Sequence, residues 1–133
     1  MMYLTATRWL AILGAISTLV LMVTMARPWG NNDAFQDLSG YALLLLMAAW
    51  ATLPYLVVFF MAKRAVPVKG KEIAVFIGAL ILFAGGLAVY VDAMWLHPDP
   101  QGGLAFIAVP LYQGIVLGVL AGVLLLVQKR KAP

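Results

Sequence analysis

Four long segments without a charged side chain set the strongest constraint on how this chain can fold. They run over residues 9–26, 38–62, 73–91 and about 104–128. A helix needs about 20 apolar residues to cross the roughly 30 Å of hydrocarbon in a bilayer. Polar and apolar residues do not alternate in the segments, which excludes transmembrane strands, and helices are the remaining way to satisfy the backbone in lipid. The sequence predicts an all-α integral membrane protein, a single domain over residues 1–133 built as a four-helix transmembrane bundle.

The composition excludes a soluble globular domain. Hydrophobic residues make up 65% of the 133 residues and charged residues 11%, against roughly 45–50% and about 25% in soluble domains. A domain of this size has too little interior to bury that much apolar surface, so the lipid bilayer is the expected surrounding. The basic residues lie in short clusters at the ends of the apolar segments. Because they form no basic face, we expect no nucleic-acid partner.

Charge divides the loops into two kinds and predicts an orientation. Basic side chains occupy the loop at 63–72 and the C-terminal end: Lys63, Arg64, Lys69, Lys71, Lys129, Arg130 and Lys131. Acidic side chains occupy the loops at 27–37 and 92–103: Asp33, Asp37, Asp92 and Asp99. The positive-inside rule then places both termini and loop 63–72 in the cytoplasm and the two acidic loops outside. The expected location is a bacterial inner membrane. Short loops predict that sequential helices are antiparallel neighbours in an up-down bundle.

Two further features bear on the ends of the segments. Aromatic residues fall where interfacial belts are expected: Trp29, Tyr41, Tyr90 and Trp95 at the outer side, and Trp9, Phe59 and Phe60 at the inner side. The first segment follows Arg8 and ends in Thr24-Met25-Ala26, which loosely fits a signal-peptide cleavage site. Its apolar core is longer than the roughly 7–15 residues of a signal sequence, so we expect it to remain as an anchor.

The fourth segment carries a row of glycines, Gly114, Gly118 and Gly122. Spacing by four places them on one helix face, where another backbone can approach closely. Packing within this bundle is the more ordinary use of such a row, and small residues in the other segments are candidate mates: Gly14, Thr18, Ala74, Gly78, Gly85 and Gly86. A contact face for a partner chain or a second copy is the alternative.

Three residues inside the segments could form a hinge or line a pathway. Pro54 and Pro110 each remove one helical hydrogen bond, which favours either ordinary curvature or a gating hinge. Gln113 is the most polar side chain that follows Pro110 in its segment. An interhelical hydrogen bond is the expected role for its amide, and a substrate path is the sharper alternative.

The loop after the third segment gathers the only histidine and two carboxylates. Asp92 ends that segment, where the helix dipole disfavours a carboxylate, and we expect Arg27 to pair with it. Asp99 and Pro100 predict the start of the fourth helix, and Asp37 or Ser39 is a candidate cap for the second. The ordinary interpretation of His97 is an interfacial loop histidine without a special role, and a histidine that titrates or contacts a partner is one alternative. A divalent metal on His97 and Asp99, joined by Asp92 or by Asp33 and Asp37, is another.

Catalysis finds little support in the sequence. Cysteine is absent, which removes thiolate metal sites and cysteine nucleophiles, and no phosphate loop, HExxH or GxSxG occurs. We predict no resident cofactor. The leading interpretation is a non-enzymatic accessory or interaction subunit that packs through the glycine row against a larger membrane complex or against itself. A small oligomeric transporter or channel is the first alternative, and a metal-handling protein or membrane enzyme that uses the outer loop is the second.

Overall fold

The computed structural model describes residues 1–28, 30, 33, 36–64, 69–98 and 102–129. They form four α-helices: α1 Met2–Ala26, α2 Leu38–Arg64, α3 Lys69–Val91 and α4 Ala105–Lys129. A π-helical turn, η2 (Asp92–Leu96), extends α3, and a short 3-10 turn, η3 (Gly102–Leu104), precedes α4. The predicted helical class is confirmed, because the structure has four helices long and apolar enough to cross a membrane and shows no strand within the described residues.

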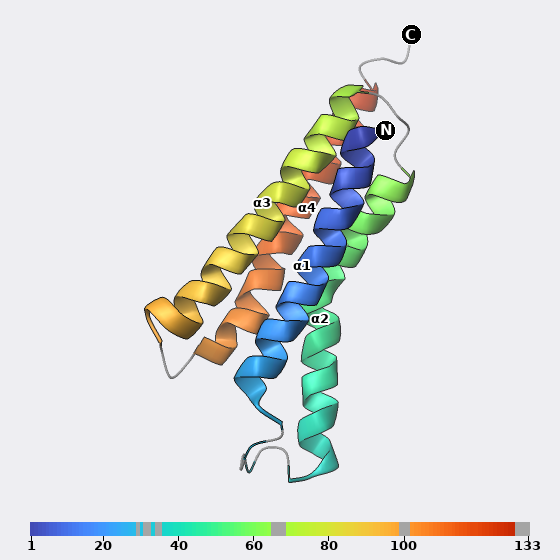
Figure 1. Cartoon of the computed structure of the whole chain (residues 1–133). Coiled ribbons are helices and arrows are strands. Elements are labelled where there is room, and N and C mark those ends of the chain that lie inside the picture. Colours follow the sequence, from blue (N-terminus) through green and yellow to red (C-terminus); the bar gives the residue numbers. More distant parts are fainter. Residues whose placement is uncertain (29, 31–32, 34–35, 65–68, 99–101, 130–133) are drawn as a thin grey trace.

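The helices run alternately up and down, so that the N-terminus, the start of α3 and the ends of α2 and α4 share one end of the bundle (Figure 1). Around the bundle, α1 packs mainly against α2 and α3, and α4 packs mainly against the same two helices. Helices α2 and α3 therefore lie across a diagonal although they follow each other in the chain. The expectation that all sequential helices are neighbours is wrong for this pair.

The buried face of α1 explains this arrangement. Its buried residues recur every three or four positions and are mostly small: Leu4, Thr7, Ala11, Gly14, Thr18 and Met22. Such spacing places them on one face of the helix. Because small side chains let neighbouring backbones approach closely, this one face accommodates both α2 and α3.

Glycines inside the bundle make room for side chains from neighbouring helices, as Gly14 and Gly78 show. The ring of Tyr55 on α2 occupies the position that a Cβ atom at Gly14 would take. A Cβ at Gly78 on α3 would lie 2.7 Å from Cδ2 of Leu120 on α4. Each glycine thus leaves the space that a larger residue fills, which is how interiors reach close packing.

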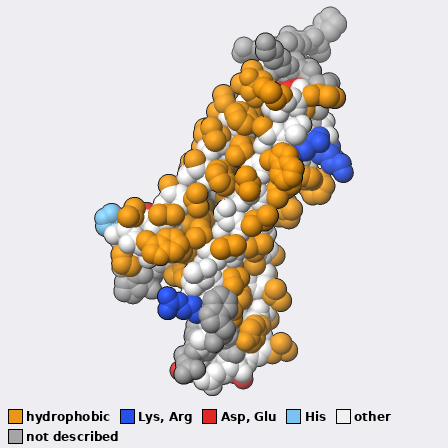
Figure 2. Space-filling model, viewed as in Figure 1, with side chains coloured by type: hydrophobic (Ala, Val, Ile, Leu, Met, Phe, Trp, Pro, Cys, Tyr) orange, Lys and Arg blue, Asp and Glu red, His pale blue; other side chains and the backbone are white. Residues whose placement is uncertain are grey.

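The outside of the bundle is apolar. Hydrophobic side chains cover most of the visible face in Figure 2. Leu45 is 71% exposed, Ile115 69% and Val119 63%. This is far more continuous apolar surface than soluble monomers expose, and it is what a helix bundle solvated by lipid would present.

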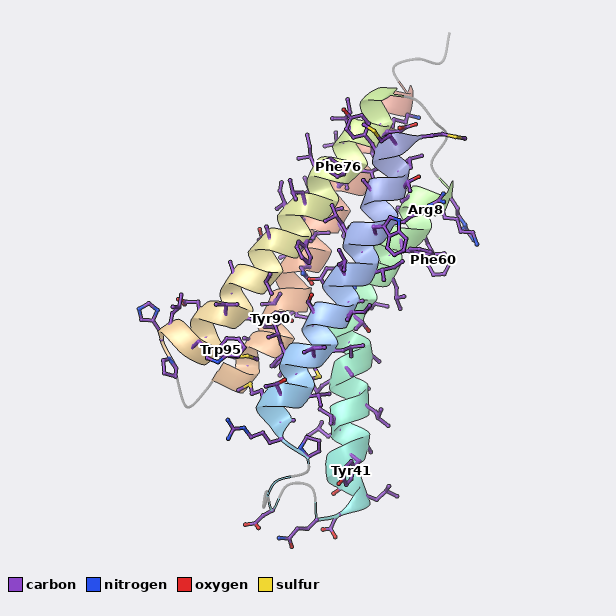
Figure 3. All side chains as sticks on the ribbon, viewed as in Figure 1. Arg8, Tyr41, Phe60, Phe76, Tyr90 and Trp95 are labelled. Atoms are coloured by element: carbon purple, nitrogen blue, oxygen red, sulfur yellow. The ribbon has the colours of Figure 1, made fainter. Side chains whose placement is uncertain are left out.

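Tyr90 corrects one expectation about the interfacial aromatic residues. It is 1% exposed, and its ring stacks on that of Phe106 with centroids 4.7 Å apart. Tyr90 lies at the expected depth near the end of α3, but on the side that meets α4, so helix face and not depth decides its burial (Figure 3). Other members of the proposed belts are exposed, namely Trp9, Tyr41, Phe60 and Trp95, whereas Phe59 is partly buried against the core. Trp29 lies outside the described residues.

The contact between Gly14 and Tyr55 predicts a strong effect of a small substitution. A Cβ at position 14 overlaps the Tyr55 ring, so we expect Gly14→Ala to lower the free energy of unfolding by about 1–3 kcal/mol. Gly118→Ala is the matched control, because no atom lies within 4 Å of its Cβ position and alanine favours helix. Thermal unfolding of both variants in detergent measures the difference. Equal stability of the two variants would contradict the contact.

Candidate functional site

A polar cluster lies in the centre of the bundle and joins three helices. Gln113 of α4 is fully buried. Its Nε2 donates to the hydroxyl of Tyr55 on α2 at 3.0 Å and to the carbonyl of Leu82 on α3 at 3.1 Å. The interhelical hydrogen bond expected of Gln113 is therefore present, and it reaches two helices.

Gly86 of α3 makes room for this cluster. A Cβ at position 86 would lie 2.6 Å from Nε2 of Gln113 and 3.0 Å from the Tyr55 hydroxyl oxygen. Within the described residues, two buried oxygens nearby in the bundle lack a hydrogen-bond partner, Oε1 of Gln113 and the hydroxyl of Tyr90. A buried unsatisfied polar group costs about 1–3 kcal/mol. The bundle core therefore contains hydrogen-bonding atoms that the protein itself leaves unpaired.

Both in-span prolines are compatible with continuous helices. Helices α2 and α4 run unbroken through Pro54 and Pro110, and both prolines are buried. Pro54 directly precedes Tyr55, so the polar cluster lies beside it. A pathway or hinge role for Pro54, Pro110 and Gln113 stays a prediction.

The glycine row of α4 points away from the other three helices. Nothing lies within 4 Å of a Cβ built on Gly114, Gly118 or Gly122. The expectation that this row packs inside the bundle is therefore wrong. The reason lies in the opposite side of α4, which carries Val109, Gln113 and Leu117 and is the side buried in the bundle. A helix cannot turn both faces inward.

The outer loop contains a closed π-turn. The backbone N–H of His97 donates to the carbonyl of Asp92 at 2.8 Å, and Nδ1 of His97 lies 2.8 Å from Oδ1 of Asp92. The expected Arg27–Asp92 ion pair is wrong: in the part of the chain that the structure describes, the Asp92 carboxylate contacts the imidazole of His97 instead. The π-turn explains this, because it brings position 97 back over position 92.

The other predicted roles in these loops are only partly visible. Asp99 and Pro100 lie outside the described residues, and α4 begins later than they predicted, at Ala105. Asp37 directly precedes α2, and its carbonyl accepts the N–H of Gly40 at 3.2 Å. Across the described residues, no three His, Cys, Asp or Glu side chains come together as a metal site. A metal on His97 and Asp99 stays a prediction.

Sequence reasoning missed two of the buried polar groups. Tyr55 lies deep within an apolar segment, and a hydroxyl at that depth was the available signal that it needs a partner. Glu72 is 4% exposed, and its carboxylate accepts from the Met1 ammonium at 2.8 and 3.0 Å. A lone acid in a basic loop was the available signal for Glu72.

The hydrogen bond between Gln113 and Tyr55 predicts a measurable coupling. In a double-mutant cycle of Gln113→Leu and Tyr55→Phe, we expect a coupling energy of about 0.6 kcal/mol, since interhelical hydrogen bonds average that value in membranes. Equilibrium unfolding in detergent or bicelles measures it. Tyr112→Phe is the matched control, because Tyr112 neighbours Gln113 in sequence but is 46% exposed. Coupling as large for Tyr112 as for Tyr55 would contradict the assignment.

Comparison of the chain with protein families, with curated proteins and with solved structures finds no match. What the protein does is therefore inferred from its own residues and their placement. Two features distinguish the molecule: the buried polar cluster inside the bundle and the open glycine row on the outer side of α4.

Proposed function

We propose that this chain is a multi-pass membrane protein that serves as an accessory or interaction subunit. It binds a transmembrane helix of another chain, either a component of a larger membrane complex or a second copy, through the glycine row of α4. The partner helix packs along Gly114, Gly118 and Gly122. Close van der Waals packing over small residues is the main source of affinity between helices in lipid.

One observation carries this proposal: the glycine row has open space at all three positions. Three glycines inside the bundle differ, since neighbouring side chains occupy the space beside Gly14, Gly78 and Gly86. Glycine lowers helix stability by about 1 kcal/mol relative to alanine when nothing packs against it. Three glycines on one lipid-facing stripe of α4 therefore lower its intrinsic stability, and a partner helix would compensate this.

The distribution of charge supports an orientation for the proposed membrane protein. Lys63 and Arg64 end α2 at the end of the bundle that holds the N-terminus, and Asp92 lies at the opposite end (Figure 1). By the positive-inside rule, the basic end faces the cytoplasm. A bacterial inner membrane with both termini inside is the proposed location.

Cysteine labelling tests the orientation directly, because the chain has no native cysteine. We expect a membrane-impermeant maleimide to label Gln36→Cys in intact spheroplasts and to label Lys63→Cys only after lysis. Both positions are exposed, so access and not burial decides the labelling. The reverse pattern would overturn the orientation.

Photo-crosslinking tests the partner face. A photoreactive amino acid at Ile115, beside the glycine row, should give a discrete crosslinked species in membranes. The same amino acid at Leu45 on α2 should not, although the exposed fractions of the two side chains are matched at 69% and 71%. The mass of the crosslinked species separates a second copy from another protein.

The substitution Gly118→Leu tests whether the crosslink depends on the glycine row. Because the space around Gly118 is open, we expect the variant to keep the thermal stability of the bundle and to lose the crosslink from Ile115. Val119→Ile, a neighbouring exposed position off the row, should keep the crosslink. An unchanged crosslink in Gly118→Leu would refute the proposed face.

A further inference from the structure

An apolar groove opens at the end of the bundle that carries the acidic loops. It lies between the last turn of α1, the first turns of α2 and the start of α4, and it has a volume of about 510 Å³. Apolar side chains line it: Met22, Met25, Leu43, Leu44, Met47 and Phe106. The lining also includes three small residues, Ser39, Gly40 and Gly103, of which Ser39 is polar.

The groove lies beside the first half of α2, which is less deeply buried than its second half although Leu44, Met47 and Ala48 pack against the core. The buried residues of α2 begin at Ala51, and none of the residues from Leu38 to Trp50 is buried. Figure 1 shows this part of α2 extending beyond the neighbouring helices. An empty apolar space is unfavourable, and flexible methionine side chains adapt to an occupant of irregular shape.

Arg27 follows the groove residues of α1 in sequence and lines the neighbouring cleft. It follows Ala26, a residue that lines the groove, and its exposed side chain lines a second cleft that shares Met25 with the first. Among the described residues, Arg27 is the one non-glycine residue with a positive φ, 44°. Glycine is favoured at such a position after a helix. An arginine there adopts a conformation costing of order 1 kcal/mol, a pattern associated with functional sites.

We propose that this groove binds one glycerophospholipid, with an acyl chain between α1, α2 and α4 and with the phosphate at Arg27. Charge complementarity supports this occupant. In the described part of the chain, the Asp92 carboxylate contacts His97 and not Arg27, which leaves the Arg27 guanidinium available to an anion. Guanidinium groups bind phosphate through paired hydrogen bonds.

The depth of the groove agrees with a phospholipid. Arg27 lies one residue beyond α1, where the apolar segment ends and headgroups are expected, and the methionines and leucines lie within the helices. The site requires the helices to span a bilayer, as proposed above, but it uses none of the glycine-row residues. Lipid binding and partner binding can therefore fail independently.

Native mass spectrometry of the purified chain with dioleoylphosphatidylglycerol tests the site. We expect one lipid to remain bound to the wild-type protein after detergent exchange. Gly103→Leu should lose it, because the Cβ at position 103 meets only Cε of Met25 at 3.9 Å and the added side chain enters the groove. Arg27→Gln should weaken binding of this lipid about tenfold, as expected for the loss of a hydrogen bond to a charged group.

The controls separate the site from general association with lipid. Gly70→Leu places the same side chain at an open position outside the groove, and Arg64→Gln removes an exposed arginine at the opposite end. Both should bind like the wild type. Dioleoylglycerol, which lacks the phosphate, should bind equally to the wild type and Arg27→Gln. Failure of the wild type to retain lipid, retention by Gly103→Leu, or equal losses in the controls would overturn the proposal.

Discussion

The contact between the Tyr55 ring and the backbone of α1 at Gly14 is the interaction on which the rest of the bundle depends. It brings α1 and α2 together closely enough that the Tyr55 hydroxyl reaches the centre. There Gln113 meets the hydroxyl and extends to the carbonyl of Leu82. One tyrosine thereby connects α1 through its ring with α4 through its hydroxyl, and Gln113 adds α3. Hydrogen bonds gain strength in such surroundings of low dielectric.

This central cluster also determines which surfaces remain outside. Because Gln113 faces inward, the glycines that lie on the other side of α4 face outward. Glycine therefore has two roles in this protein. Neighbouring side chains fill the space beside Gly14, Gly78 and Gly86, whereas the space beside Gly114, Gly118 and Gly122 is open. The proposed partner face and the proposed lipid groove both lie where the helices of the bundle do not pack tightly against one another. The partner face lies on the outer side of α4, and the groove lies beside the first turns of α2, where no residue of that helix is fully buried.

The fold class could be predicted because bilayer thickness sets the length of an uncharged segment. The segments at 38–62 and 104–128 match α2 and α4 closely, whereas α1 begins earlier, at Met2. The neighbours of each helix could not be predicted. In a soluble protein, an apolar stripe identifies the buried face. These helices are apolar on all sides, so the sequence predicts the wrong surroundings for Tyr90 and favours the wrong packing for the glycine row.

The four apolar helices, their alternation and the separation of basic from acidic loops can be predicted from the residues alone, because these properties depend on composition along the chain. Helix packing is needed to establish that α2 lies diagonal to α3, that Asp92 contacts His97 and that the glycine row is open. Those outcomes depend on which side chains fit together at short range. The physical reason is that hydropathy specifies how far a helix extends, whereas complementary shape and hydrogen bonding specify which way it faces.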